Sequence, residues 1–175
     1  GSIVRAVSNG GEVYTWNGAW VLEQDTGADD LYGVDIFNST LGFAVGGSAK
    51  IWRWNGSFWT QANDSGNFNF RSVAIFNSTL GFAVGDGGVI YRWNGTVWYL
   101  NQDMGSNNIY SVVIQSGTLA FAAGASGKIY LWNGATWVET TDTGNNIHYD
   151  AAFVNSSKAF TASSGGRIYE WNGGS

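Results

Sequence analysis

Tyr and Arg side chains recur at one spacing along this chain and could bind a ligand together. The positions lie at a constant interval, at the start of matching segments. Tyr and Arg carry much of the binding energy at protein interfaces, and they also suit sugars. The candidate ligand-binding residues are Tyr32, Arg71, Tyr110 and Tyr149, with His148 beside the last. The same pattern also fits side chains that pack between structural units and leave their polar tips in water.

A catalytic centre is hard to build from this sequence. The single histidine, His148, lies near Asp150, but no neighbouring Ser is marked as a nucleophile, and the chain has no Cys. A glycosidase needs two unlike carboxylates in one asymmetric site. The most prominent carboxylates here are equivalent by repeat, and unrepeated ones such as Asp35, Glu139 and Glu170 are scattered. We therefore expect a protein that is not an enzyme and uses no cofactor.

Acidic loops are the candidates for metal binding. A D-x-G motif recurs at the same interval, at Asp25, Asp64, Asp103 and Asp142. A Ca²⁺ site needs six to eight converging oxygen atoms, and no single loop offers enough carboxylates. Asp in this position more often caps its own turn. We expect no metal site.

A tryptophan motif shows that the whole chain is a repeat. The Trp of W-N-G recurs at an almost constant interval, and residues 36–46 are identical to residues 75–85. We expect each Trp to pack between units while Asn-Gly forms a turn, although a ring of sugar-stacking Trp side chains is an alternative use. The structural repeat residues are Trp16, Trp54, Trp93, Trp132 and Trp171, with Asn17, Asn55, Asn94, Asn133 and Asn172.

Each unit contains four segments with the pattern of short strands. Residues 71–77 alternate and are rich in β-branched and aromatic side chains, and residues 80–85 follow after a turn. The Gly-rich residues 85–88 favour a tight turn into residues 89–93, and Asn94-Gly95 favours a hairpin into residues 96–102. Four antiparallel strands in about 39 residues form the blade of a β-propeller. The sequence therefore predicts an all-β fold, a β-propeller of four-stranded blades.

The ends of the chain leave the number of blades open. The second and third strands of the unit occur five times, and the first and fourth occur four times. The leading prediction is one domain, residues 1–175, with five blades at about 3–25, 30–64, 69–103, 108–142 and 147–173. Four blades are the alternative, with residues 18–23 completing the last one. A third possibility is an arc that closes only by pairing with another chain. Residues 1–2 and 174–175 resemble a tag remnant and a linker stub.

The segment G-F-A-V-G-D-G-G-V-I-Y-R-W-N-G-T-V-W resembles the propeller repeats of photosystem II assembly factors and the related BNR or Asp-box repeats. Their motif reads approximately G-W-A-V-G-D-G-G-T-I-L-R-T-T-D-G-G-x-T-W. Gly81–Gly88, Ile90, Arg92, Gly95 and Trp98 fit it. Asn94 stands where the Asp-box has Asp, and the loop to Trp98 is one residue shorter. The resemblance implies the blade fold.

A fainter resemblance links R-W-N-G-T-V-W-Y-L to the W-D-G-x-G-W-Y segments of fucose-binding propeller lectins. Those lectins use recurring Arg and Glu side chains to hold the sugar. In this chain the residue before the motif Trp varies from copy to copy, as Thr15, Arg53, Arg92, Leu131 and Glu170. A carbohydrate ligand is therefore an alternative to a protein ligand.

Charge and composition limit the partners. The net charge of −5 includes only eight Lys and Arg residues, which form no basic patch, so we expect no nucleic-acid partner. No apolar run approaches the roughly 18 residues needed to span a membrane, so we expect no membrane insertion. The chain has six N-x-S/T sequons, at Asn38, Asn55, Asn63, Asn77, Asn94 and Asn155. Together with a composition rich in Asn, Gly, Ser and Trp, they favour an extracellular or cell-surface location.

These observations predict a non-catalytic binding or scaffold module that takes protein or glycan at the propeller face. The alternative is a structural repeat protein without a ligand, made by natural or engineered amplification of one blade. The missing edge strands predict a monomer or a small homo-oligomer that seals the ring.

Overall fold

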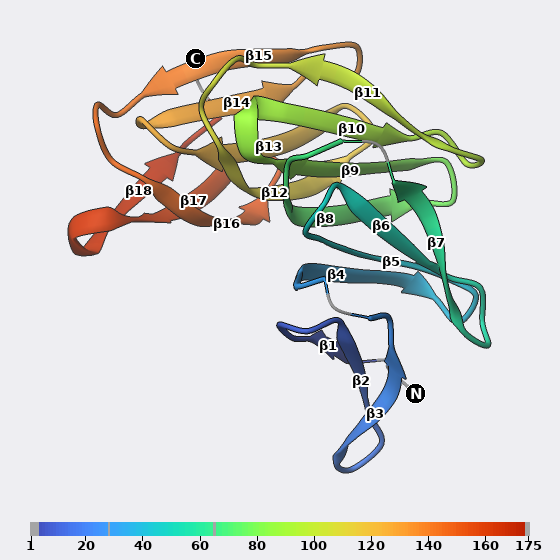
Figure 1. Cartoon of the computed structure of the whole chain (residues 1–175). Helices are drawn as coiled ribbons and strands as arrows, with labels where there is room; N and C mark the ends of the chain where they lie inside the picture. The colour runs from blue at the N-terminus through green and yellow to red at the C-terminus, as the bar shows by residue number, and fades with distance from the viewer. Residues whose placement is uncertain (1–3, 28, 65, 174–175) are drawn as a thin grey trace.

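Strands account for most of the fold in the computed structural model, which describes residues 4–27, 29–64 and 66–173 (Figure 1). They form five antiparallel sheets, which we call A to E in chain order. Sheet A contains β1 (Arg5–Val7), β2 (Glu12–Trp16) and β3 (Trp20–Asp25). Sheet B contains β4 (Leu31–Asn38), β5 (Leu41–Gly46), β6 (Lys50–Trp54) and β7 (Trp59–Asp64). Sheet C contains β8 (Phe70–Asn77), β9 (Leu80–Gly85), β10 (Val89–Trp93) and β11 (Trp98–Asp103).

The remaining sheets repeat this order. Sheet D contains β12 (Ile109–Ser116), β13 (Leu119–Gly124), β14 (Lys128–Trp132) and β15 (Trp137–Asp142), and sheet E contains β16 (His148–Asn155), β17 (Lys158–Ser163) and β18 (Arg167–Trp171). Two single 3-10 turns, η1 (Asp86–Gly88) and η2 (Ser164–Gly166), are the helical elements of the described residues. The prediction of an all-β fold built from antiparallel four-stranded units is confirmed, and sheets A and E have three strands each.

Glycine allows the tight turn between the second and third strands of a sheet. Gly87 and Gly88 have φ angles of 70° and 73°, which side chains rarely adopt. A Cβ atom on Gly88 would also lie 2.2 Å from the carbonyl oxygen of Gly105. The turn thus brings the start of the third strand against the loop that follows the fourth strand. Gly11 and Gly127 approach the equivalent loop oxygens equally closely, at 2.2 Å, whereas sheet B has Ala49 at this place with a φ of 56°.

Successive sheets pack face to face, and their first strands lie closest together. Strand β4 contacts β8, β8 contacts β12, and β12 contacts β16. Four apolar clusters fill the four spaces between sheets, one for each neighbouring pair. The sheets therefore radiate from an inner edge formed by their first strands, as the blades of a propeller do.

The two terminal sheets are incomplete and lie apart. Sheet A lacks a first, innermost strand and sheet E lacks a fourth, outermost strand among the described residues. Strand β3 pairs with β2, so residues 18–23 do not complete the last sheet as the four-blade alternative required. Figure 1 shows an arc with sheets A and E at its two ends. The number of blades in a closed ring stays a prediction.

Candidate functional site

A β-bulge at the start of each inner strand positions the predicted ligand-binding column. In β8, Phe70 pairs with Gly85 and Ser72 pairs with Val84, so Arg71 between them has no partner across the ladder. The same shift occurs in β4, β12 and β16, and the unpaired residues are Tyr32, Tyr110 and Tyr149. A bulge bends a strand and redirects the side chain of its extra residue. Four equivalent bulges therefore direct four equivalent side chains.

A glycine lies opposite the bulge in sheets B, C and D. A Cβ atom on Gly46 would lie 1.9 Å from the carbonyl oxygen of Asp30, and one on Gly85 would lie 2.2 Å from that of Asn69. Gly124 approaches the carbonyl oxygen of Asn108 in the same way, at 2.1 Å. In sheets B, C and D the chain entering the inner strand thus crosses directly over a glycine. Sheet E has Ser163 at this place and keeps the same bulge, so the Gly favours the bulge but is not required for it.

The four column residues form one row across sheets B to E. The guanidinium carbon of Arg71 lies 4.9 Å from the centre of the Tyr32 ring. Arg71 also interacts electrostatically with Tyr110. The rings of Tyr110 and Tyr149 are 6.2 Å apart at an angle of 43°. We call these four residues the aromatic row.

The charge within the aromatic row is paired. Nε and Nη2 of Arg71 donate to the two carboxylate oxygens of Asp86 at 2.8 and 2.7 Å, and Nδ2 of Asn69 donates to the same carboxylate at 3.0 Å. The hydrogen bonds that Arg71 donates to Asp86 raise the pKa of Arg71, although burial opposes this. The Tyr32 hydroxyl donates to Asp30 at 3.3 Å. Burial and the charge of Asp30 raise the pKa of Tyr32. Arg71 is therefore held in place with its charge compensated.

Sequence reasoning missed Asp86, although a signal for it existed. The residues equivalent to Asp86 in the other units are Asn9, Gly47, Ala125 and Ser164. The only carboxylate at this position occurs in the unit that has the only Arg of the column. Such a joint change from the repeat pattern indicates a contact between the two side chains.

His148 lies in the core, apart from the exposed row. Its Nδ1 is 2.8 Å from Oγ1 of Thr161 and its Nε2 is 2.8 Å from Oγ1 of Thr143. The ring packs edge-on against Tyr169, with 5.3 Å between centres. Burial lowers the pKa of His148, which favours the neutral ring. The equivalent residues of the other inner strands are buried and apolar, namely Leu31, Phe70 and Ile109.

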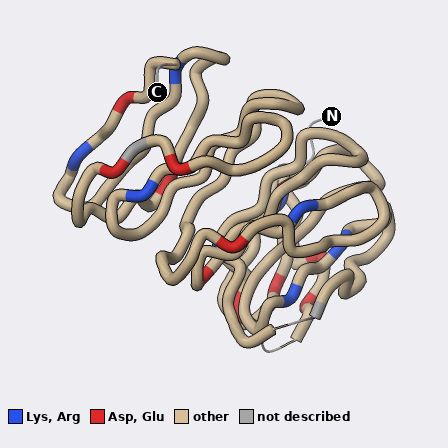
Figure 2. Tube along the Cα trace, turned by 90° about the horizontal axis from the view of Figure 1, so that it is seen from above, with Lys and Arg blue, Asp and Glu red and all other residues tan. Residues whose placement is uncertain are grey.

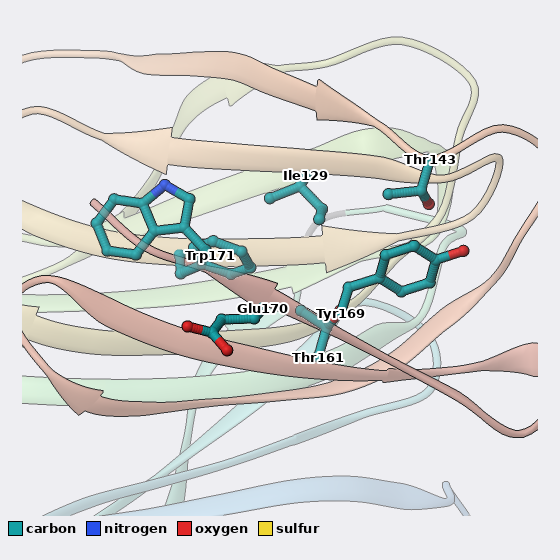
Figure 3. A pocket seen from close by; sticks show the side chains of 7 residues that line it. Ile129, Thr143, Thr161, Tyr169, Glu170 and Trp171 are labelled. Atoms are coloured by element: carbon teal, nitrogen blue, oxygen red, sulfur yellow. The ribbon is translucent and has the colours of Figure 1, made fainter. Parts of the chain in front are cut away.

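A pocket lies between sheets D and E (Figure 3), and three of its lining residues, Thr143, Thr161 and Tyr169, contact His148. At the preceding interface, Phe82 packs against both Trp132 and Trp137, the latter from an outermost strand. Sheet E has no described outermost strand to supply the equivalent Trp. The pocket is therefore a place where packing between sheets is incomplete. Its lining residues are Phe121, Ile129, Thr143, Thr161, Tyr169, Glu170 and Trp171.

The motif Trp residues differ between inner and terminal sheets. Trp54, Trp93 and Trp132 are buried, and their indole N–H groups donate to backbone oxygens of Ser39, Ser78 and Gly117 at 2.9, 2.9 and 3.1 Å. Trp16 is exposed, and Trp171 is half-buried against Phe121 and Phe153.

The motif Asn residues lie in the turns between third and fourth strands. The side-chain oxygen of Asn94 accepts hydrogen bonds from the backbone N–H groups of Thr96 and Val97 at 2.9 and 3.0 Å, and Asn55 and Asn133 repeat this pattern. The turn after Asn17 is one residue shorter, and the backbone N–H of Asn17 donates to the backbone oxygen of Ala19. Asn172 is exposed.

The D-x-G carboxylates cap their own turns. Asp25, Asp103 and Asp142 accept hydrogen bonds from the backbone N–H groups two residues later, at 2.9, 2.8 and 2.7 Å. The side chain of Asp64 lies outside the described residues. Within the described part of the chain, no three His, Asp or Glu side chains are grouped as metal ligands.

Charged residues of both signs are interspersed along the backbone (Figure 2). Asp35 is a half-buried carboxylate on β4, and it accepts hydrogen bonds from the N–H groups of Ile75 and Ile36 at 2.7 and 2.8 Å. Burial raises its pKa, and the two backbone hydrogen bonds oppose this. Asp35 therefore joins neighbouring inner strands. Of the described helices, none has the length and apolar character to cross a membrane.

Comparison with known proteins supports the fold. No protein-family model and no curated protein sequence matches the chain. Among solved structures, YCF48 from Cyanidioschyzon merolae, a photosystem II assembly factor, is 17% identical with a TM-score of 0.73, covering 97% of this chain and 63% of its own. YCF48 bound to D1 peptide is 16% identical with a TM-score of 0.73, covering 96% and 59%.

Two further propellers are similar. The computationally designed Ika8 protein is 11% identical with a TM-score of 0.77, covering 98% of this chain and 56% of its own. The WD40 β-propeller domain of Doa1 is 16% identical with a TM-score of 0.72, covering 98% and 62%. This chain is a β-propeller repeat protein, and its resemblance to photosystem II assembly factor propellers is confirmed for the fold. The chain spans about three fifths of the length of these propellers.

Proposed function

We propose that the chain is a non-catalytic module that binds an extended polypeptide segment along the aromatic row. The observation that carries this proposal is the set of four bulges, which present Tyr32, Arg71, Tyr110 and Tyr149 at the same edge of four successive sheets. Repeated packing alone does not require large, partly exposed Tyr and Arg side chains at a bulge. A row of this kind offers flat rings and hydroxyl groups to a chain that crosses the sheets.

The row is organised before any ligand arrives. Asp86 accepts hydrogen bonds from Nε and Nη2 of Arg71, and the guanidinium carbon lies 4.9 Å from the centre of the Tyr32 ring. Side chains that are already ordered lose little conformational entropy on binding. Tyr adds large contact area with few rotatable bonds. Since the Arg71 charge is compensated, we expect binding to depend weakly on salt.

The dimensions of the row suit a short peptide. Neighbouring groups are separated by 4.9 Å at one end and 6.2 Å at the other. These two spacings together cover about 11 Å, the length of about three extended residues, and the spacing between Arg71 and Tyr110 adds to it. A similar propeller, YCF48, has been solved with a D1 peptide bound, which supports a polypeptide as the class of ligand.

Pairing of the charged groups supports a role without catalysis. The Asp86 carboxylate is occupied by Arg71 and Asn69, and the carboxylate of Asp30 accepts hydrogen bonds from Tyr32 and from the backbone N–H of Gly10. Neither carboxylate is placed beside an activated nucleophile among the described residues. A general acid or base needs a reacting group within hydrogen-bond reach.

Selection from a random library of twelve-residue peptides on the immobilised chain tests the proposal. The enriched peptides are then titrated calorimetrically against the chain and against Tyr110→Ala. We expect at least tenfold weaker binding to Tyr110→Ala, since one side chain of this kind contributes more than about 1.4 kcal/mol. Tyr99→Ala is the control, because Tyr99 is an exposed Tyr on the outermost strand β11, and this variant should bind the peptides as the original chain does.

Other outcomes would contradict the proposal. Binding to a glycan array that is lost in Tyr110→Ala, without any enriched peptide, would make the ligand a sugar. No enrichment and no glycan binding would favour the alternative of a structural repeat without a ligand. Enriched peptides that bind Tyr110→Ala as well as the original chain would place their site elsewhere.

A further inference from the structure

The outer face of sheet A exposes a pair of tryptophans that is buried in every complete sheet. Trp16 and Trp20 are 47% and 49% exposed. The equivalent residues of sheets B, C and D are at most 7% exposed, namely Trp54 and Trp59, Trp93 and Trp98, and Trp132 and Trp137. In those sheets the pair faces the preceding sheet. Sheet A has no preceding sheet among the described residues.

The exposed pair has nearly the spacing of the buried ones. The rings of Trp16 and Trp20 are 5.4 Å apart, compared with 5.6, 5.8 and 5.8 Å in sheets B, C and D, and their interplanar angle is 63°, compared with 48°, 43° and 48°. Covering the pair therefore needs only a small rotation of one ring. A patch of two large apolar rings is also unusual on the surface of a protein.

Sheet E exposes the complementary surface at the other end of the arc. Ile168 is 74% exposed, whereas the equivalent Ile51, Ile90 and Ile129 are at most 4% exposed. Ile168 lines a shallow groove with Phe160, Ala152 and Ala162. The equivalents of Phe160 are Phe43, Phe82 and Phe121, which are all buried against the following sheet.

The two exposed surfaces are halves of an interface that the chain already makes. Phe43 of sheet B lies 4.9 Å from both Trp93 and Trp98 of sheet C. Phe82 of sheet C lies 5.0 and 4.9 Å from Trp132 and Trp137 of sheet D. Phe160 of sheet E has no such Trp pair beyond it among the described residues, and the Trp pair of sheet A has no such Phe there. The Phe of sheet E and the Trp pair of sheet A are thus complementary. One difference is Lys158, whose Nζ lies 5.8 Å from the centre of the Phe160 ring and which stands where sheets B and C have the buried Leu41 and Leu80.

We propose that sheet A of one copy of this chain docks on sheet E of a second copy. Phe160 and Ile168 then pack against Trp16 and Trp20 of the second copy, as Phe82 and Ile90 pack against the Trp pair of sheet D. This contact is head-to-tail. Two docked copies therefore leave one sheet A and one sheet E free, unless the assembly closes into a ring. It is independent of the aromatic row, which lies on the inner strands.

The geometry of the arc favours a second copy over closure within one chain. Sheets A and E lie apart at the two ends of the arc (Figure 1). The five sheets superpose on parts of larger propellers and span only about three fifths of their length. To bring its own ends together, the chain would have to increase the rotation between all its sheets. Docking of a second copy leaves the four internal interfaces unchanged.

The mass of the chain in solution tests this proposal, measured by light scattering over about a hundredfold range of concentration. We expect the mass of two or more chains at high concentration. Ile168→Glu and Trp20→Glu should each reduce it to the mass of one chain, because each places a charge in the new interface. Both sites are already largely exposed, so the fold should persist, as circular dichroism would verify. Val97→Glu is the control, an exposed site on the hairpin of sheet C.

Mixing the two variants distinguishes head-to-tail docking from other contacts. Ile168→Glu retains an intact sheet A, and Trp20→Glu retains an intact sheet E. Together they should form a complex with one copy of each. A mixture that stays at the mass of one chain would overturn the proposal. The proposal would also be overturned if the original chain had the mass of one chain at every concentration. The same holds if Ile168→Glu or Trp20→Glu still formed assemblies of the original mass.

Discussion

Two neighbouring interfaces of this propeller cover the same pair of Trp rings with different chemistry. Between sheets B and C, the ring of Phe43 packs on Trp93 and Trp98, at 4.9 Å from each. Between sheets A and B, the residue equivalent to Phe43 is Arg5, whose guanidinium carbon lies 4.2 Å from Trp54 and 5.7 Å from Trp59. A cation over an aromatic face is attracted to it electrostatically. The two side chains therefore occupy equivalent places for different reasons.

The charged interface needs a partner that the apolar one lacks. Glu23 accepts two hydrogen bonds from Arg5, both of 2.7 Å, and one of 2.9 Å from the indole N–H of Trp59. In the other interfaces the equivalent indole N–H groups of Trp98 and Trp137 have no partner among the described residues. Since the Arg5 side chain is only 4% exposed, its charge depends on Glu23. A repeat can thus change one apolar contact into a charged network when two of its positions change together.

The apolar interface should show the largest effect of a single substitution. We expect Phe82→Ala to lower the free energy of unfolding by about 3–5 kcal/mol, because it leaves a cavity between Trp132 and Trp137. Urea unfolding followed by Trp fluorescence measures this. Phe58→Ala is the control, since Phe58 lies exposed in a turn, and it should change stability by less than about 0.5 kcal/mol. Equal losses would mean that the buried Phe contributes no more than an exposed one.

Removing Glu23 should break the charged interface. We expect Glu23→Ala to destabilise the fold by about 3 kcal/mol, because it leaves the buried Arg5 charge without a partner. Asn101→Ala is the matched control at the equivalent position of sheet C, where the side-chain oxygen has no partner to lose. A loss in the control as large as in Glu23→Ala would show that the position, and not the charge pair, determines stability.

A double substitution then converts the charged interface into the apolar type. Arg5→Phe with Glu23→Ala reproduces the residues of sheet B, Phe43 and Ala62. We expect this pair to recover most of the stability that Glu23→Ala loses, since apolar replacements of buried ion pairs are often neutral or stabilising. A double-mutant cycle gives the coupling between the two sites. If the stability losses of Arg5→Phe and Glu23→Ala simply added in the double variant, the two side chains would not be coupled.

Acid should weaken the charged interface selectively. Burial raises the pKa of Glu23, but hydrogen bonds from Arg5 and Trp59 and the charge of Arg5 outweigh it and hold the pKa below its ordinary value of 4.5. A carboxyl with a lowered pKa in the folded state stabilises the fold above its unfolded pKa, and this contribution is lost as the pH falls through the folded value. The stability difference between the original chain and Glu23→Gln should therefore be largest above pH 4.5 and shrink below it. A difference that is constant from pH 3 to 7 would contradict this.

The turns that lead into the third strands of sheets B and C should give the smallest effect. Ser48 adopts a φ of 56° where the equivalent Gly87 has 70°. Ser48→Gly removes this strain, but Gly also increases the conformational entropy of the unfolded chain. We therefore expect the free energy of unfolding to rise by only about 0.5 kcal/mol. Gly87→Ser should lower the free energy of unfolding. The new side chain would meet open space, but the backbone would keep a φ of 70°, which is strained for Ser. Thermal unfolding of both variants measures the difference.

The strands of this protein could be predicted from the sequence because their signals are local. The predicted strands at residues 80–85 and 89–93 agree with β9 and β10, and the Gly-rich turn between them adopts the positive φ angles that its residues favour. The recurrence of these signals at a constant interval predicted the sheets and their order. The column of Tyr32, Arg71, Tyr110 and Tyr149 was also visible, since equivalent positions of a repeat lie at equivalent places.

Tertiary structure decided which of these residues meet and which are buried. His148 and Tyr149 are adjacent in sequence, but the bulge exposes Tyr149 while His148 enters the core between Thr143 and Thr161. Arg5, Glu23 and Trp59 become one network only because sheet A packs on sheet B. Likewise, W-N-G reads the same in every unit, yet Trp16 is exposed and Trp54 is buried. The burial of each Trp depends on the sheet packed against it. The local sequence of one repeat unit therefore does not determine it.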